Sequence, residues 1–343
     1  MRTKIAPGQA MGGLPPVYQT QTRTYQADRC RPVMEAVASG QICYESLSRG
    51  HYPGRLLRRT ELPGVSLVGF WDTKRDQDWG LDWHRNEGIE LMLLEAGSLA
   101  YGCDGLEHLL APGDLTIARP WQPHRVGAPR ITASRVHFLI IDVGVRRPHQ
   151  AWTWPAWVSL TPSDRKELTA VIRHTKQVAW HAGGAVRRCF QQVGHTVEKD
   201  RAGSQISLLT VHLNELLVRL LEMFRSERIE LDESLGSAQR TVELFWNDLA
   251  SRVDHLAASW TVTKMARHCG MSVSRFIHFS RRLYNRTPIK HLNRLRVEQA
   301  ARLLAEDPGR TVTDIALSLG FSSSQYFATV FLREMGCSPS AIR

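Results

Sequence analysis

Two short segments near the C-terminal end carry side chains that can hydrogen-bond to the edges of nucleic-acid bases. Arg binds guanine O6 and N7 with two hydrogen bonds, and Arg275 and His278 are the best candidates for base contact. Gln325 can pair with adenine and Thr329 can touch a thymine methyl group, which makes a weaker set of base readers. The full expected set is Ser274, Arg275, Ile277, His278, Arg281 and Arg282, followed by Ser323, Ser324, Gln325 and Thr329. We expect the first segment to supply more base specificity, the second more positioning, and Arg281 and Arg282 to meet phosphates.

An internal repeat must position these two segments. Residues 261–266 align with residues 311–316, and Gly270 and Gly320 follow at the same offset. In each copy the glycine favours a left-handed helix end. A serine cap, Ser272 or Ser322, then starts the second helix. This order predicts two helix-turn-helix units, joined by a helix over residues 288–306.

The charge distribution agrees with a polyanionic partner. The chain has 343 residues and a formal net charge of +11. Residues 239–343 hold 15 Lys and Arg against 8 Asp and Glu, which is +7 of that total. A basic excess confined to one region is typical of a domain that binds nucleic acid. The six cysteines include no C-x-x-C pair, which favours a reducing cytoplasm. The chain has no run of eighteen apolar residues, so the sequence predicts no membrane span.

The rest of the chain divides by its hydrophobic pattern. Short β-type runs separated by Gly and Pro fill residues 65–143 and predict a β-sandwich or small barrel. Residues 162–181 and 205–224 can form helices, and residues 225–237 have the composition of a linker. Apolar residues of the second helix form a heptad-like stripe, which either packs on its own domain or pairs with its copy in a dimer. The members of that stripe are Ile206, Leu209, Leu213, Leu216, Leu220 and Met223.

The C-terminal region resembles the AraC/XylS family of bacterial transcription regulators. The resemblance rests on residues 288–304, which look like that family's linker helix, and on residues 315–322. It continues with Tyr326, Phe327, Phe331, Gly336, Ser338 and Pro339. Four positions depart from the family pattern: Asn285 for glycine, His291 for tyrosine, Ser280 for phenylalanine and Leu332 for a basic residue.

The β-rich region resembles the cupin-like sensor domain of the same family. The matching residues are Glu90 with Gly97, then residues 112–114, then residues 119–124. In catalytic cupins the positions of His84, Glu90 and His124 hold a metal such as Fe, Mn or Zn, although Asp82 stands here in place of a further histidine. We expect no cofactor, and expect these residues to orient loops or touch a ligand instead.

A cluster of tryptophans suggests a small-molecule pocket. Aromatic faces stack on sugar rings, so the expected ligand is a sugar or sugar acid, or else another small polar metabolite. Arg85 and Arg125 could add anion recognition, as could Arg119. The expected ligand-binding set is Trp83, His84, Glu90, Arg119, Trp121 and His124.

The resemblance implies an α+β protein of several domains. We expect a flexible arm (1–28), a cupin-like β-barrel (29–160), a helical dimerisation region with linker (161–237) and an all-α DNA-binding domain (238–343). The leading hypothesis is a cytoplasmic, non-enzymatic regulator that binds duplex DNA, a small-molecule effector, RNA polymerase and a second copy of itself. The alternative is a metal-dependent cupin enzyme fused to a DNA-binding domain, which stoichiometric metal on His84, Glu90 and His124 would favour. A third possibility is a sensor domain that has lost its ligand and serves as a dimer scaffold.

Overall fold

The computed structural model describes residues 31–342 apart from 51, 252 and 308. The expected arm over residues 1–28 lies outside the described residues. The chain separates into two compact units, one ending at Gly236 and the other beginning at Ser237. The helical region expected at residues 161–237 therefore belongs to the same compact unit as the β-rich region.

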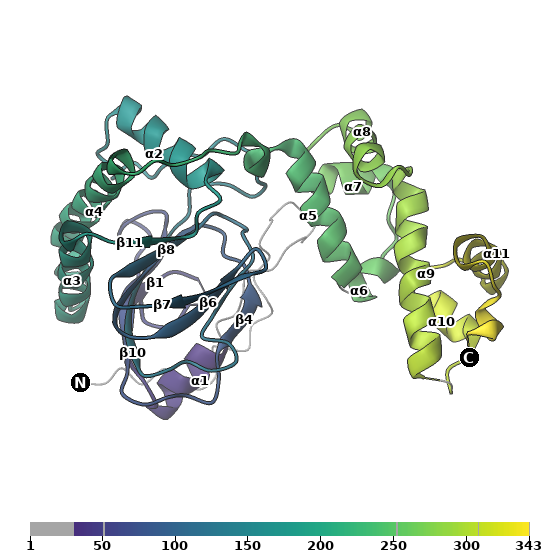
Figure 1. Ribbon diagram of the computed structural model, residues 1–343, viewed down its shortest axis with the longest axis horizontal. Helices are drawn as coiled ribbons and strands as arrows, with labels where there is room; N and C mark the ends of the chain where they lie inside the picture. The colour runs from purple at the N-terminus through teal and green to yellow at the C-terminus, as the bar shows by residue number, and fades with distance from the viewer. Residues whose placement is uncertain (1–30, 51, 252, 308, 343) are drawn as a thin grey trace. The chain divides into compact units, whose positions relative to one another are not determined.

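The N-terminal unit contains two β-sheets whose strands are mostly antiparallel (Figure 1). The seven-stranded sheet has the order β11-β8-β5-β10-β3-β1-β2. Its strands are β1 (Cys43–Ser48), β2 (Arg55–Leu56), β3 (Val65–Thr73), β5 (Ile89–Gly97), β8 (Asp114–Ala118), β10 (Ser134–Ile141) and β11 (Ala179–His181). The four-stranded sheet comprises β4 (Leu81–His84), β9 (His124–Val126), β6 (Leu99–Cys103) and β7 (Leu106–Leu110). Asp104 and Gly105 both have positive φ, 47° and 84°, as a two-residue hairpin turn between β6 and β7 requires.

Two separate hydrophobic cores explain why the strands of the large sheet are apolar on both faces. Along β5, Leu91 and Leu93 pack toward the helices, whereas Met92 and Leu94 pack between the two sheets. A strand with both faces buried shows a nearly continuous apolar run instead of alternation. Glu90 has the same parity as Met92, so the strand geometry directs this carboxylate between the sheets.

The helices of this unit pack on the outer face of the large sheet, apart from α1 (Arg31–Ser39), which contributes Val33 and Ala36 to the core between the sheets. They are α2 (Pro162–His174), α3 (Gly184–Lys199) and α4 (Ile206–Ser226), and α3 and α4 lie side by side (Figure 1). Helix α3 was not predicted. The prediction of a helix to residue 181 is wrong beyond His174, because residues 179–181 form β11 and pair with β8.

The apolar stripe of α4 is a core face of its own unit. Leu209, Leu213, Leu216 and Leu220 are each fully buried in the core shared with α2, α3 and the large sheet. The predicted linker is also partly ordered, with η1 (Glu233–Gly236) packed on α2. The exposed apolar residues of α4 lie elsewhere on the helix: Leu208, Val211 and Val218.

The C-terminal unit is entirely helical and contains two helix-turn-helix units. The first is α7 (Val262–His268) with α8 (Val273–Tyr284), and the second is α10 (Val312–Ser318) with α11 (Ser324–Met335). Helix α9 (Pro288–Glu306) joins them, α5 (Ala238–Ser251) and α6 (Val253–Ala257) precede them, and η2 (Pro339–Ala341) follows. No helix in the described part of the chain is long and apolar enough to span a membrane.

The helix caps and left-handed residues confirm the helix-turn-helix order predicted for the repeat. Gly270 and Gly320 have φ of 62° and 81°, and Asn285 ends α8 in the left-handed region at φ 52°. Thr311 caps α10 by accepting a hydrogen bond from the Asp314 backbone N–H at 3.0 Å. One cap differs from the prediction: α11 is capped by Ser323 and not by Ser322, because the turn in the second copy is one residue longer.

Candidate functional site

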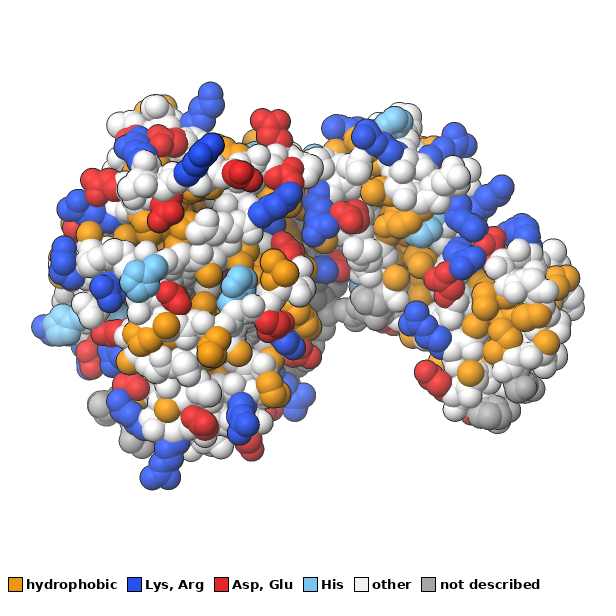
Figure 2. All heavy atoms as spheres, in the orientation of Figure 1, with side chains coloured by type: hydrophobic (Ala, Val, Ile, Leu, Met, Phe, Trp, Pro, Cys, Tyr) orange, Lys and Arg blue, Asp and Glu red, His pale blue; other side chains and the backbone are white. Residues whose placement is uncertain are grey.

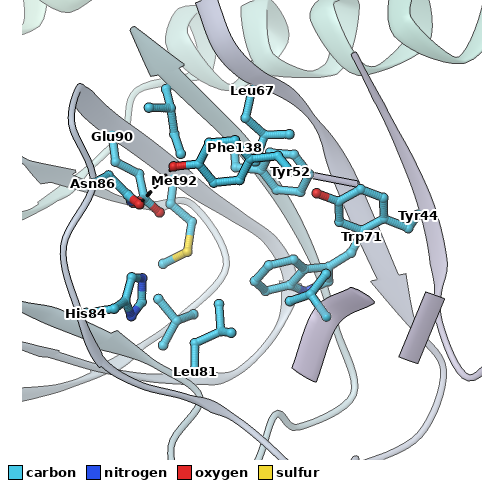
Figure 3. A pocket seen from close by; sticks show the side chains of 13 residues that line it. Tyr44, Tyr52, Leu67, Trp71, Leu81, His84, Asn86, Glu90, Met92 and Phe138 are labelled. Atoms are coloured by element: carbon cyan, nitrogen blue, oxygen red, sulfur yellow. Dashed lines mark hydrogen bonds between the residues drawn. The ribbon is translucent and has the colours of Figure 1, made fainter. Parts of the chain in front are cut away.

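A cavity lies between the two sheets of the N-terminal unit and is polar at one end. Figure 3 shows His84, Asn86 and Glu90 at this end and aromatic side chains such as Trp71 at the other. The complete lining is Val33, Tyr44, Tyr52, Leu67, Trp71, Leu81, His84, Asn86, Glu90, Met92, Val126, Phe138 and Ile140. An apolar cavity with a few convergent polar groups is a typical small-molecule site.

The polar end brings together three residues from three elements. His84 ends β4, Glu90 lies near the start of β5 and His124 begins β9. One potential ligand atom from each lies within 4.8 Å of the other two, and the His84 and His124 rings are 4.2 Å apart. His124 Nε2 is 2.9 Å from Glu90 Oε2. The structure thus brings together His84, Glu90 and His124, as the resemblance implied.

Backbone carbonyls fix which nitrogen of each ring carries hydrogen. His84 Nδ1 lies 2.6 Å from the Asp82 carbonyl oxygen, and His124 Nδ1 lies 2.9 Å from that of Gln122. A carbonyl oxygen can only accept a hydrogen bond, so each Nδ1 is the donor. The nitrogen that can act as a metal ligand is therefore Nε2 in both rings.

Glu90 is held ionised by its neighbours. Burial raises the pKa of this carboxyl, but the charge and hydrogen bond of His124, the charge of His84 and the Asn86 amide outweigh it and lower the pKa overall. Asn86 Nδ2 donates to Glu90, and Tyr52 Oη donates to Asn86 Oδ1 at 3.1 Å. Asn86 and Tyr52 were not predicted, although both orient the carboxylate.

The remaining predicted pocket residues lie outside the cavity lining. Trp83 is exposed with the Arg125 guanidinium 5.3 Å from its ring centre, since neighbouring strand residues face opposite sides. Trp121 is buried in the helix-facing core and donates from Nε1 to the Val145 carbonyl. Arg119 donates to the Thr175 carbonyl at 2.6 Å and pairs with Asp104. Of the clustered tryptophans, Trp71 lines the cavity.

The first recognition helix, α8, presents an exposed basic face. Phe276 is fully buried, while Ser274, Arg275, His278, Arg281 and Arg282 are exposed; Ile277 is half-buried. The Arg275 guanidinium lies 5.7 Å from the Phe279 ring centre. Figure 2 shows Lys and Arg side chains gathered around α8 and α9.

Arginines near α8 and α9 fall into two groups. Arg275, Arg281 and Arg282 form no ion pair with any described residue. Arg294 pairs with Glu298, and Arg286 pairs with Glu334 at 2.6 Å. The first group therefore keeps its charge exposed on α8.

The second recognition helix, α11, carries few charges. Gln325 and Thr329 are exposed, and Ser324 is half-buried. Thr329 Oγ1 donates to the Gln325 carbonyl at 3.1 Å. Ser323 accepts a hydrogen bond from the Tyr326 backbone N–H and so caps the helix, and its contact with bases stays a prediction. Leu332 is exposed, and a phosphate contact there is not available.

Two of the departures from the family pattern compensate each other. Ser280 is buried and accepts a hydrogen bond from Trp246 Nε1 at 3.2 Å, so the indole of α5 occupies space beside the smaller side chain. His291 stacks on Tyr284 with ring centres 3.9 Å apart and meets the Trp246 ring edge-on. Burial lowers the pKa of His291 to about 4.

Comparison with known proteins gives matches in both units. Residues 72–216 match the model of an AraC-like ligand binding domain, and residues 265–343 match a helix-turn-helix domain. The MmsAB operon regulatory protein of Pseudomonas aeruginosa is 33% identical over 322 residues, covering 92% of this chain and 90% of that protein. The transcriptional activator RhaS of Klebsiella pneumoniae is 31% identical over 263 residues, covering 76% of this chain and 86% of that protein. The crystal structure of ToxT from Vibrio cholerae O395 has 12% identity and a TM-score of 0.33, covering 81% and 96% of the two chains.

The two domains and their relatives define a ligand-responsive transcription regulator with separate ligand-binding and DNA-binding domains. The chain belongs to the AraC/XylS family.

Proposed function

We propose that α8 and α11 bind two successive boxes of a specific duplex DNA site, and that a small molecule in the cavity changes this binding. The observation that carries the first part is the outward basic face of α8, where Arg275, Arg281 and Arg282 have no ion-pair partner among the described residues. Internal pairing uses other arginines of this unit, so this face retains its charge for a polyanion.

The DNA proposal is tested by selecting fragments of genomic DNA with the full-length chain. A recovered non-palindromic site with two boxes is expected. Each phosphate contact should add about −0.9 to the slope of log K against log salt, so Arg281→Ala combined with Arg282→Ala should make the slope shallower by about 1.8. A flat salt response of the unsubstituted chain would contradict DNA binding through this face.

The cavity favours an effector with an apolar body and one polar group. Its walls are mostly aliphatic and aromatic, and its imidazole, amide and carboxylate side chains, those of His84, Asn86 and Glu90, cluster at one end. A sugar, with hydroxyl groups on every side, would leave several of them against apolar walls. We therefore place the sugar or sugar acid suggested by the tryptophans second. Arg85, Arg119 and Arg125 do not line the cavity.

A reporter gene under the selected site tests the effector class. Sugars, sugar acids and short branched or aromatic acids and alcohols are compared for a response. Ile140→Trp, which fills the cavity, should abolish the response, whereas Trp83→Ala outside the cavity should preserve it. A response lost only in Trp83→Ala would move the effector site to the exposed face of β4.

We further propose that the chain dimerises through the exposed face of α4 and not through its heptad stripe. Leu208→Glu with Val211→Glu should shift sedimentation from dimer to monomer without unfolding. Leu213→Glu with Leu220→Glu should instead unfold the N-terminal unit, because both leucines are fully buried in it. A wild-type chain that is monomeric at micromolar concentration, with and without DNA, would refute the dimer.

We propose that the chain is a regulator without enzymatic activity, located in the cytoplasm and acting on RNA polymerase. The metal-dependent enzyme stays the alternative because His84, Glu90 and His124 do converge. Turnover of the bound small molecule would favour the enzyme. Effector-dependent transcription from purified components, with the effector recovered unchanged, would favour the regulator.

A further inference from the structure

The aromatic end of the cavity contains an indole N–H without an acceptor. Trp71 lies on β3 between Tyr44 of β1 and Val136 of β10, and its side chain extends into the cavity (Figure 3). The residue is 5% exposed, and its Nε1 forms no hydrogen bond with any described residue. A buried N–H without an acceptor costs free energy, so a bound molecule that presents an oxygen atom to it is favoured.

The opposite end of the cavity presents a carboxylate oxygen that accepts no hydrogen bond. Asn86 Nδ2 and His124 Nε2 both meet Oε2 of Glu90, whereas Oε1 takes no hydrogen bond from the residues that the structure describes. Glu90 lines the cavity, and its lowered pKa keeps the carboxylate ionised. An ionised carboxylate can only accept hydrogen bonds, so a molecule in the cavity meets Oε1 best with an O–H or N–H group.

The lining offers an anion no net positive charge. Among the described residues around the cavity there is no Lys or Arg. The imidazole of the lining is that of His84, and its ligand atom lies within 4.8 Å of one from Glu90, so a charge on His84 would be balanced there. A carboxylate that leaves water for such surroundings loses its hydration without gaining a cationic partner, which is strongly unfavourable.

We propose that the cavity selects an uncharged effector with a hydrogen-bond donor at one end and an acceptor oxygen at the other. This inference rests on the proposed function and refines it, because it adds a second polar group to the effector and excludes carboxylates. The donor binds Glu90 Oε1, the acceptor oxygen takes the Trp71 N–H, and the apolar body lies against Leu81, Met92 and Ile140. Hydroxy amides and hydroxy ketones with an apolar ring or branched chain between the two groups have this chemistry.

Probes that share a carbon skeleton test this selection by calorimetry on the full-length chain without DNA. Hydroxymethyl-cyclohexanecarboxamide, substituted across the ring, is uncharged and carries both groups. The corresponding carboxylate has nearly the same shape and should bind at least about 100-fold more weakly, the scale expected for a buried charge without a partner. Cyclohexanecarboxamide lacks the hydroxyl donor and should bind about 10-fold more weakly. The same comparison is made with smaller and larger rings.

Two tryptophans give a matched pair of variants. Trp71→Phe keeps an aromatic ring but removes the N–H, and should weaken binding of the hydroxy amide by about 2- to 12-fold. Trp180 Nε1 is also buried without an acceptor among the described residues, but it belongs to the helix-facing core and does not line the cavity. Trp180→Phe should therefore leave the affinity unchanged. Thermal unfolding of each variant checks that it is folded.

The charge of Glu90 is tested separately. Glu90→Gln removes the negative charge and should narrow the preference for amide over carboxylate by about 10-fold or more. In the NMR spectrum of the wild-type chain, the indole N–H resonance that is missing from Trp71→Phe should shift when the hydroxy amide binds.

Three results would each overturn the proposed effector class. They are carboxylates that bind as tightly as their amides, equal losses in Trp71→Phe and Trp180→Phe, and no binding of any hydroxy amide up to millimolar concentration. Regulation fails separately from this selection. A chain that binds the hydroxy amides but selects no DNA would support the effector class and refute the proposed function. A DNA response to an anionic effector would refute the effector class and leave the proposed function standing.

Discussion

The two helix-turn-helix units share a backbone pattern but differ in their chemistry. In the first, α8 is basic on its outer face, and polar side chains such as Ser280 and His291 are buried in the core. In the second, the buried residues of α10 and α11 are all apolar, and the exposed residues of α11 include Leu332 and Met335. The repeat therefore conserves the positioning of the recognition helices while their surfaces are free to diverge.

The two units are joined by buried hydrogen bonds as well as by the chain. Arg296 of α9 donates to the carbonyls of Leu256 and Ala258 before the first unit, and to Gly320 in the turn of the second. Glu334 of α11 pairs with Arg286 at the junction between α8 and α9. These contacts hold the two helix-turn-helix units at a fixed spacing, so that they act as one rigid DNA-binding body.

The largest expected effect comes from changing the spacing of the two DNA boxes. Helix α9 has 19 residues. At 1.5 Å per residue this is about 28 Å, near the roughly 34 Å between major grooves one turn apart. Inserting five base pairs puts the boxes on opposite faces and should lower affinity by about 100-fold or more, toward that of a single-box site. Quantitative footprinting measures this, and unchanged affinity would show that the units bind independently.

Loss of Arg296 should have the next largest effect. Arg296→Met removes the donor to the carbonyls of Leu256 and Gly320, while the Ala258 carbonyl still accepts from the Trp260 N–H, and each buried group left without a partner costs about 1–3 kcal/mol. The free energy of opening of α10 and α11 should fall by about 3 kcal/mol or more, measured by amide hydrogen exchange in the full chain. Arg302→Met, at an exposed position of the same helix, is the control and should change it little. Equal effects of both would exclude a locking role for Arg296.

The two recognition helices should differ in base reading. Arg275→Ala should relax preference in the first box at a cost of about 1–3 kcal/mol. Gln325→Ala should act on the second box and more weakly, because a neutral amide contributes less than a charged bidentate donor. Binding to a panel of single-base variants of the site measures both. A loss from Arg275→Ala that is uniform across the panel would assign this residue to phosphate instead of base.

The features of the helix-turn-helix repeat that the sequence predicted are local ones. Caps and left-handed residues such as Gly270, Gly320 and Asn285 are dictated by a few neighbouring residues, and so the repeat was placed almost residue by residue. The misplaced cap at Ser322 arose because serines stand at positions 322, 323 and 324, and only the fold selects Ser323 over Ser322. Capping energies for the two are similar, so the sequence offers no choice between them.

The N-terminal unit shows where such reasoning stops. Strand β11 forms only because β8 is available to pair with it, and α4 buries its stripe against a helix that periodicity did not reveal. His84, Glu90 and His124 were found through the family resemblance, whereas Asn86 and Tyr52 carry no pattern that marks them. Sequence alone does not fix which face of a short strand is buried, so Trp83 was expected in the pocket although it lies outside the lining of the cavity.

The smallest expected effect tests whether only the first unit is sensitive to acid. His291 has a pKa lowered by burial to about 4, against about 6.5 in an unfolded chain. The unfolded state therefore binds more protons between these values, so the first unit is fully stable above pH 6.5 and loses stability as the pH falls toward 4. At pH 5.5 the loss should be about 1 kcal/mol.

His291→Phe retains the stacking on Tyr284 and should remove this part of the pH dependence, while its stability should agree with that of the wild type at pH 7.5. Hydrogen exchange resolves the two units: protection of α8 should fall with acid in the wild type and hold in the variant, whereas α11 should change alike in both. A fall in α8 protection that persists in His291→Phe would assign the acid sensitivity to another group and remove this difference between the units.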